Sequence, residues 1–130
     1  MIVVDSSAVT EVVLHLSAVA AVERRVHDMC ETLHAPHLID AEVAHVVRRY
    51  VMRGEVDSER GRIAIGALVD FPVRRHPHLL LLPRVWELRH NLTAYDAVYV
   101  ALAEALDAPL ITRDRRLAAS SGHRARIELF

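Results

Sequence analysis

Short apolar runs that end beside an acid recur along the chain and predict buried strands that lead into helices. Residues 2–4, Ile-Val-Val, form the first run and stop at Asp5. Residues 109–112, Pro-Leu-Ile-Thr, form another and lead into Asp114. Runs this short and this apolar are typical of strands buried on both faces of a sheet. Further extended segments are expected around Pro36, over residues 71–77 and, as a possible final strand, over residues 127–130.

Apolar residues at helical spacing fill the intervals between these strands and predict a series of helices. Ser6 and Ser7 offer N-caps for the first of them, and Asp40 offers one for a later helix that Gly54 stops. The expected helices are residues 6–14, 18–33, 38–53, 57–69, the part of 79–90 after Pro83, 93–106, and a short helix after Asp114 that Gly122 closes.

Strands separated by helices predict an α/β fold with a mainly parallel central sheet flanked by helices. The length of 130 residues fits a single domain over residues 1–130. Hydrophobic residues make up 52% of the chain and charged residues 25%, which excludes the composition of a disordered protein. No apolar run approaches the roughly 20 residues that span a bilayer, and no signal peptide is recognisable, so we expect a cytoplasmic protein without membrane contact.

The single cysteine, Cys30, excludes an internal disulfide and a multi-cysteine zinc site. We expect it on a helix face in a reducing compartment. The histidine pairs His34/His37 and His76/His78 are expected in loops or on the surface rather than around a metal ion. A disulfide scaffold and a zinc centre built from cysteines are therefore both excluded.

Positive charge is concentrated near the C-terminus, although the formal net charge of −1 gives no global sign of a nucleic-acid binder. Every basic residue of the chain is an arginine. Taken alone, the C-terminal cluster fits either a solvated face or a contact for RNA. Its members are Arg113, Arg115, Arg116, Arg124 and Arg126, opposed by Asp114 and Glu128.

Asp96 is the only charged residue in residues 93–103, an otherwise apolar stretch that predicts a helix buried nearly all round. An unpaired carboxylate in such surroundings costs several kcal/mol, about as much as a large share of the stability of a domain. Two explanations compete. Thr93 as N-cap and Asp96 three residues later form a capping-box pattern at the positive end of the helix. Alternatively, the acid shares a metal ion with other acids.

Asp5 and Asp114 each follow a predicted strand and open a helix, and in a parallel sheet all such junctions lie at the carboxyl edge, where ligands bind. Asp96 and Glu42 lie in the first turns of two other helices, whose N-termini can face the same edge. Each acid alone also fits a helix-start residue that is favourable to the helix dipole. Together, these four acids are predicted to converge.

As a set, these segments resemble the PIN-domain nucleases, and most of all the VapC toxins of bacterial toxin–antitoxin pairs. The resemblance covers nearly the whole chain in the order and size of the family. It implies a PIN-like fold and a metal-dependent endoribonuclease that a VapB antitoxin holds inactive. The segments that carry it are residues 2–8, IVVDSSA; 38–49, LIDAEV leading into VRR; 92–103, LTAYDA with YVALA; and 110–117, LITRDRRL.

By position, Asp5, Glu42, Asp96 and Asp114 correspond to the acidic tetrad of the family, and Thr112 matches a hydroxyl residue that supports the site. The implied ion is Mg²⁺ or Mn²⁺, which takes oxygen ligands and keeps several waters. Asp5 and Asp96 are expected as the main ligands. Asp114 is expected as a direct or water-mediated ligand and Glu42 as the acid that orients or deprotonates water, although these two roles can be exchanged.

RNA brings phosphates toward this acidic site, so nearby arginines must offset the repulsion. Arg113, Arg115 and Arg116 adjoin Asp114 and are candidates for that contact. Family analogy points to unpaired loops of structured RNAs such as tRNA or rRNA, and to a homodimer. The segment from residue 55 to residue 90 carries no recognisable motif and does not indicate which RNA is cut.

Other functions fit less of the sequence. A phosphoacceptor aspartate in a signalling receiver or a phosphatase normally has a lysine nearby, and this chain has none; Asp5 also lacks a second aspartate two residues later. A catalytically silent partner-binding module keeps the fold, but the complete set of acids argues against it. An RNA-processing nuclease of the same fold that works without an antitoxin remains open.

Overall fold

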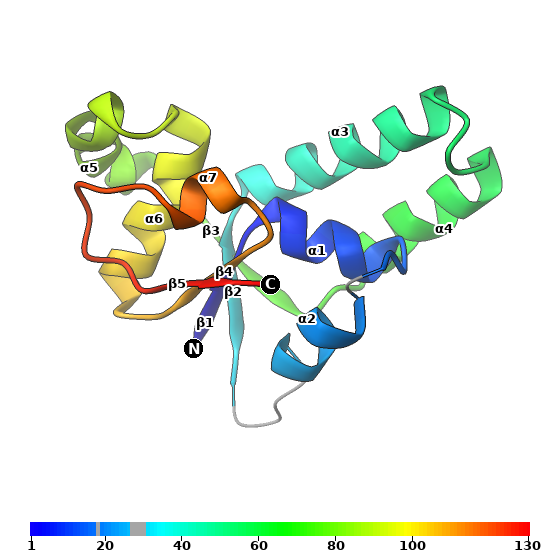
Figure 1. Ribbon diagram of the computed structural model, residues 1–130, viewed down its shortest axis with the longest axis horizontal. Helices are drawn as coiled ribbons and strands as arrows, with labels where there is room; N and C mark the ends of the chain where they lie inside the picture. The colour runs from blue at the N-terminus through cyan, green and yellow to red at the C-terminus, as the bar shows by residue number, and fades with distance from the viewer. Residues whose placement is uncertain (18, 27–30) are drawn as a thin grey trace.

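The computed structural model describes residues 1–17, 19–26 and 31–130, and in this part of the chain five strands form one sheet. Every neighbouring pair of strands is parallel, which confirms the predicted α/β class with a parallel central sheet. Helices lie on both sides of the sheet (Figure 1). The strands are β1 (Ile2–Val4), β2 (Leu33–Pro36), β3 (Val73–His76), β4 (Leu110–Thr112) and β5 (Ile127–Leu129).

The strand order is β3-β2-β1-β4-β5, so the chain reverses its direction of travel across the sheet between β1 and β4. Such a switch point leaves a crevice at the carboxyl ends of the two strands, because their connections leave on opposite sides. The pairing of Val4 with Ile111 places the next residues of the two strands, Asp5 and Thr112, side by side. The fold therefore brings together two sequence-predicted site residues that lie far apart in the chain.

The helices form two groups on either side of the sheet (Figure 1). Helix α1 packs on α2, α3 and α4, and α3 pairs with α4 as an arm that projects from the body (Figure 1). On the other side, α5 packs on α6, and α6 packs on β1 and β2. The helices are α1 (Ser6–Val13), α2 (Val19–Val26), α3 (Leu38–Met52), α4 (Ser58–Val69), α5 (Leu82–Glu87), α6 (Ala94–Leu106) and α7 (Arg115–Ala118), with 3₁₀ turns at Leu79–Leu81 and Leu88–His90.

Helix α6 is the most deeply buried of the described helices, and the sequence correctly predicts its burial. Its residues 97–103 are all buried, as expected for a helix that is apolar all round. The strands β1, β2 and β4 are buried over their whole length, consistent with their position in the middle of the sheet. No helix in the described ranges is both long and apolar enough to cross a membrane.

Several predicted boundaries and caps are wrong. Asp5, rather than Ser6 or Ser7, caps α1, because its carboxylate accepts the Ala8 N–H. Leu33 belongs to β2 and not to the preceding helix, since burial in the sheet outweighs its helix propensity. Asp40, the predicted N-cap, lies inside α3, because this helix starts at Leu38. Its carboxylate binds Arg75 of β3 instead.

Two further predictions, for Gly122 and for the histidines, are wrong. Gly122 does not close α7, which already ends at Ala118 with Ala119 as C-cap; Gly122 has φ +85° in the following loop. His34 and His76 are not loop residues: they stack between β2 and β3, with the two rings joined by a 2.8 Å hydrogen bond. Cys30 and part of the predicted helix over 18–33 lie outside the described residues.

Candidate active site

Asp5 is a buried carboxylate at the end of β1, with 5% of its surface exposed. Its Oδ1 accepts hydrogen bonds from the Ser7 hydroxyl at 2.7 Å and from the Ala8 N–H at 3.0 Å. Its Oδ2 accepts one from the Thr112 hydroxyl at 2.6 Å. All three donors are neutral, so the negative charge is oriented by hydrogen bonds without a positive partner.

Thr112 and Ser7 connect this carboxylate to the loop that carries Asp114. The Thr112 hydroxyl, buried at the end of β4, accepts the Asp114 N–H at 2.8 Å. The Ser7 hydroxyl accepts the Arg113 N–H at 2.8 Å. Because each hydroxyl contacts both Asp5 and this loop, the two strand ends are held in one fixed arrangement.

Asp114 caps α7. Its Oδ1 accepts the N–H groups of Arg116 at 2.7 Å and Leu117 at 3.3 Å. The side chain is half-buried, and its other oxygen, Oδ2, is not engaged by these capping bonds. The helix-start interpretation of this acid is therefore correct, and it leaves one carboxylate oxygen available for a ligand.

Glu42 lies in the second turn of α3 rather than in the first turn as predicted, because the helix starts at Leu38. It contacts α6 through Tyr99. The Tyr99 hydroxyl donates a short hydrogen bond to Glu42 Oε2. The tyrosine ring is buried, so the bond fixes the half-buried glutamate between the two helices. A buried phenol needs a hydrogen-bond partner, and Glu42 supplies it.

Asp96 lies in the first turn of α6, at the half-buried end of the helix rather than in its apolar interior. Thr93 is the N-cap, as predicted, because its Oγ1 accepts the Asp96 N–H at 3.2 Å. The capping box predicts that the Asp96 carboxylate accepts a backbone N–H, but it accepts the Thr93 hydroxyl instead, at Oδ2 and 2.9 Å. Because Asp96 is half-buried and bonded to Thr93, its position in α6 does not by itself require a counter-ion.

Burial and mutual repulsion make the ionised forms of two of these acids unfavourable. Burial raises the pKa of Asp5, and its hydrogen bonds with Thr112, Ala8 and Ser7 offset only part of this effect. Burial also raises the pKa of Glu42, and the negative charges of Asp5 and Asp96 raise it further. The pKa of Tyr99 is raised by its own burial and then by Glu42, so the phenol stays protonated and keeps donating.

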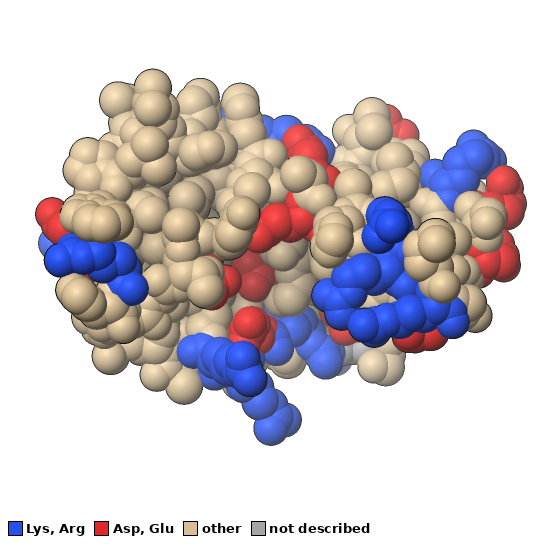
Figure 2. Space-filling model, turned by 90° about the horizontal axis from the view of Figure 1, so that it is seen from above, with Lys and Arg blue, Asp and Glu red and all other residues tan. Residues whose placement is uncertain are grey.

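The four acids thus fall into two linked groups. Asp5 and Asp114 share Thr112, while Glu42 lies within electrostatic range of Asp5 and Asp96. Figure 2 shows acidic side chains gathered in a hollow of the face above the sheet, with basic side chains around it. Within the described ranges, no three histidine, cysteine or acidic side chains lie close enough together to hold one ion by themselves.

The arginines beside Asp114 differ in their surroundings. Arg113 is partly buried, with Nη1 3.7 Å from Glu11 and with an Nε–H that has no hydrogen-bond partner in the described part of the chain. Arg115 and Arg116 are exposed on α7. Arg113 is thus the member of this group with a free buried donor.

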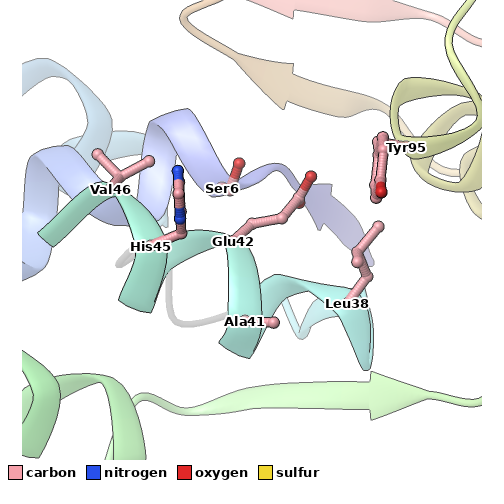
Figure 3. A pocket seen from close by; sticks show the side chains of 7 residues that line it. All are labelled: Ser6, Leu38, Ala41, Glu42, His45, Val46 and Tyr95. Carbon is pink, nitrogen blue, oxygen red and sulfur yellow. The ribbon is translucent and has the colours of Figure 1, made fainter. Parts of the chain in front are cut away.

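Glu42 also borders a pocket of about 470 Å³ between α3, α1 and the start of α6 (Figure 3). Its carboxylate lies between the rings of His45 and Tyr95 in this view. The lining residues are Ser6, Leu38, Ala41, Glu42, His45, Val46 and Tyr95.

Three residues of the site, Ser7, Tyr99 and Tyr95, are not among those predicted from the sequence. Tyr99 has a detectable signal, because it follows Asp96 by three residues and so lies on the same side of α6. Its polar hydroxyl in a buried helix also requires a partner. Ser7 has no such signal beyond its place two residues after Asp5, where it was expected to act only as a helix cap.

Comparisons with known proteins agree with this architecture. Residues 2–121 match the model of the PIN domain. Ribonuclease VapC1 of Mycobacterium tuberculosis is 46% identical over 129 residues, which are 98% of this chain and 96% of that protein. Ribonuclease VapC12 of the same organism is 45% identical over 129 residues, 99% of this chain and 98% of that protein.

Solved structures give the same picture at the level of the fold. The crystal structure of PAE2754 from Pyrobaculum aerophilum superposes with a TM-score of 0.68 and 28% sequence identity, covering 96% of this chain and 81% of that one.

Proposed function

The chain belongs to the PIN-domain family, among its VapC ribonucleases, and from this premise we propose that it is a metal-dependent endoribonuclease with a site built on Asp5, Glu42, Asp96 and Asp114. The observation that carries the proposal is the buried carboxylate of Asp5. It lies beside a second acid whose pKa its charge raises, and every group that binds it is neutral.

The residues present fit a divalent cation. Among the described residues, no arginine or histidine pairs with Asp5 or Glu42, so the negative charge that collects at the strand ends lacks compensation within the protein. Carboxylate oxygens are the ligands that Mg²⁺ and Mn²⁺ prefer. Since no three of these side chains meet at one point, we assign direct contacts to one or two carboxylates, with water and substrate phosphate oxygens completing the shell.

When bound, such an ion supplies a water of lowered pKa and neutralises charge on the phosphoryl oxygens. Asp5 and Asp96 are the proposed main ligands. Asp114 contributes through the oxygen that α7 leaves free, and Thr112 keeps Asp5 and the Asp114 loop in register.

Glu42 is the proposed proton acceptor. The pKa of Glu42 is raised, so it lies nearer to neutral pH than the pKa of an exposed glutamate. Such a pKa suits a group that takes a proton from water. Tyr99 binds Oε2 and so holds the carboxylate between α3 and α6. In the reaction, the water oxygen bonds to phosphorus and Glu42 receives the water proton. The bond from phosphorus to the leaving oxygen breaks as that oxygen takes up a proton from solvent water.

RNA is the proposed substrate, with Arg113 as its first phosphate contact. Arg113 lies between Thr112 and Asp114, and its side chain is 31% exposed, so its guanidinium can donate to a phosphate oxygen. Arg115 and Arg116 add positive charge on the exposed face of α7. By analogy with the family, the targets are unpaired loops of structured RNAs such as tRNA or rRNA.

In the cell, we propose that the protein is the toxin of a VapBC-type pair. A cognate VapB-type antitoxin would hold it inactive, and the active form would be a homodimer in the cytoplasm. The support for this assignment is the identity of 46% with a VapC ribonuclease over nearly the full length of both chains.

The metal requirement is tested by assaying purified protein, freed of any antitoxin, on a structured RNA in Mg²⁺ or Mn²⁺ and again in EDTA. We expect cleavage with either ion, its loss in EDTA, and its return when excess metal is added. Cleavage at the same rate in EDTA contradicts the metal mechanism. The matched protein control is Asp70→Asn, an exposed acid at the end of α4, which should cleave like the wild type.

A further inference from the structure

The pocket beside Glu42 has the walls of a binding site for a flat, uncharged ring. Leu38, Ala41 and Val46 give it an apolar floor along α3, and the Tyr95 ring closes one end (Figure 3). Its volume of about 470 Å³ falls in the range of small-molecule sites. Polar groups are few: the Ser6 hydroxyl and the His45 imidazole join the Glu42 carboxylate.

Tyr95 is 62% exposed although it belongs to α6, whose residues 97–103 are all buried. It stands directly before Asp96, a proposed metal ligand, and its ring lines the same pocket as Glu42. Exposed aromatic rings next to a catalytic centre are the usual platforms on which unpaired nucleobases stack. No packing requirement of the core accounts for this ring.

Charge decides which part of an RNA fits this pocket. A phosphate placed here would meet the carboxylate of Glu42, and anions repel each other most where water is partly excluded. A nucleobase is neutral and carries N–H donors, so it can approach the same wall without this penalty. The phosphates therefore follow the arginines and the metal site, and a base enters the pocket.

We propose that this pocket is a nucleobase subsite in which an unpaired base next to the scissile phosphate stacks on Tyr95, with Ser6 and His45 at the base edge. The inference rests on the proposed function and deepens it. A base in a duplex is stacked on both faces and paired along its edge, so only a looped or single-stranded nucleotide reaches the pocket. The subsite thus selects unpaired RNA at the cleavage position.

Binding can be measured separately from cleavage in an Asp114→Asn background. The probe is a single-stranded RNA of about 12 nucleotides with 2-aminopurine, whose fluorescence falls on stacking, placed in turn at each position. We expect quenching at one position. Tyr95→Ala should remove this quenching and raise the dissociation constant about tenfold to a hundredfold, while Tyr95→Phe, which keeps the ring, should raise it less than about threefold.

Two controls separate stacking from general damage. Trp86→Ala removes another exposed ring, 69% exposed on α5 and outside this pocket, and should not change the quenching. An abasic RNA lacks the base at the quenched position. It should bind the protein that keeps Tyr95 about as weakly as intact RNA binds Tyr95→Ala. The unfolding free energy of each variant, from urea denaturation, establishes that it is folded.

The outcomes distinguish this inference from the proposed function. Equal affinity and quenching for wild-type and Tyr95→Ala backgrounds overturn the subsite, even where the wild-type protein cleaves RNA. The subsite is also overturned if Tyr95→Ala weakens the binding of intact RNA and of abasic RNA by the same factor, because the ring then contacts the RNA backbone rather than the base. Absence of cleavage by the wild type, with Tyr95-dependent quenching retained, contradicts the proposed function instead.

Discussion

At the scale of single residues, the site depends on how a buried carboxylate is held. Asp5 is bound by two hydroxyls and one backbone N–H, and the hydroxyl of Thr112 also fixes the Asp114 loop. The sequence predicts Asp5 and Asp114 because each follows an apolar run. The family resemblance also gives Thr112 a supporting role. The local pattern does not predict which groups Thr112 and Ser7 bind across β1 and β4, because these bonds depend on the register between strands more than a hundred residues apart.

Replacing Thr112 by valine should destabilise the protein by about 1–3 kcal/mol, because the shape is kept while a buried carboxylate and a backbone N–H lose their partner. Thr112→Ser keeps the hydroxyl and should cost less than about 1 kcal/mol. Urea denaturation at neutral pH measures both values. Equal stability of Thr112→Val and the wild type would show that the hydroxyl is not a structural link.

At the scale of elements, pattern and structure agree best where a helix is long and its face is clear. Helix α4 begins after Asp57 and ends at Val69, as the sequence predicts. Agreement is poorest where packing decides. Leu33 joins β2 because the strand is buried, and Asp40 binds Arg75 across to β3 rather than capping α3. Such long-range contacts outweigh local propensity and are invisible to it.

The packing of α3 against α4 can be tested with two glycines of α4. A Cβ on Gly61 would lie 2.6 Å from Val51 Cγ2, whereas one on Gly66 would meet nothing within 4 Å. Gly61→Ala should therefore destabilise the protein by about 1–3 kcal/mol, and Gly66→Ala should stabilise it by up to about 1 kcal/mol through helix propensity. Thermal or urea unfolding of the pair checks this, and stabilisation by both substitutions would contradict the close helix contact.

The pairing of β2 with β3 should make stability depend on pH. Burial lowers the pKa of His34, and the positive charges of His76 and Arg74 lower it further. At pH values between this lowered pKa and the ordinary pKa of about 6.5, His34 binds a proton in the unfolded chain but not in the folded protein. Acidification through that window should therefore reduce the contribution of His34 to the unfolding free energy.

The His34→Gln variant, which does not titrate, should lose less stability than the wild type when the pH falls from 7 to 5. Exposed His90→Gln should behave like the wild type. The measurement is urea denaturation at each pH. A His34→Gln protein with the wild-type dependence would place the acid sensitivity elsewhere in the chain.

At the scale of the whole molecule, the fold converts scattered acids into one surface. The sheet changes direction between β1 and β4, and Glu42 of α3 lies within electrostatic range of Asp5 and Asp96. Acidic side chains gather in a hollow of the face above the sheet (Figure 2). Alternating strands and helices predict the parallel sheet, but they do not give the strand order, because local pattern does not encode which strands pair. A short neighbouring reading frame that encodes a DNA-binding antitoxin would support the toxin assignment over a role in RNA processing.

The central claim is that the acids form a metal-dependent site for RNA cleavage, and Asp96→Asn tests it most directly. Asparagine keeps the size of the side chain and the Thr93 cap, so the unfolding free energy should stay within about 1 kcal/mol of the wild type. In Mg²⁺, the cleavage rate of a structured RNA should fall at least about a hundredfold, because a charged metal ligand is lost. Cleavage by folded Asp96→Asn at the wild-type rate would contradict the account.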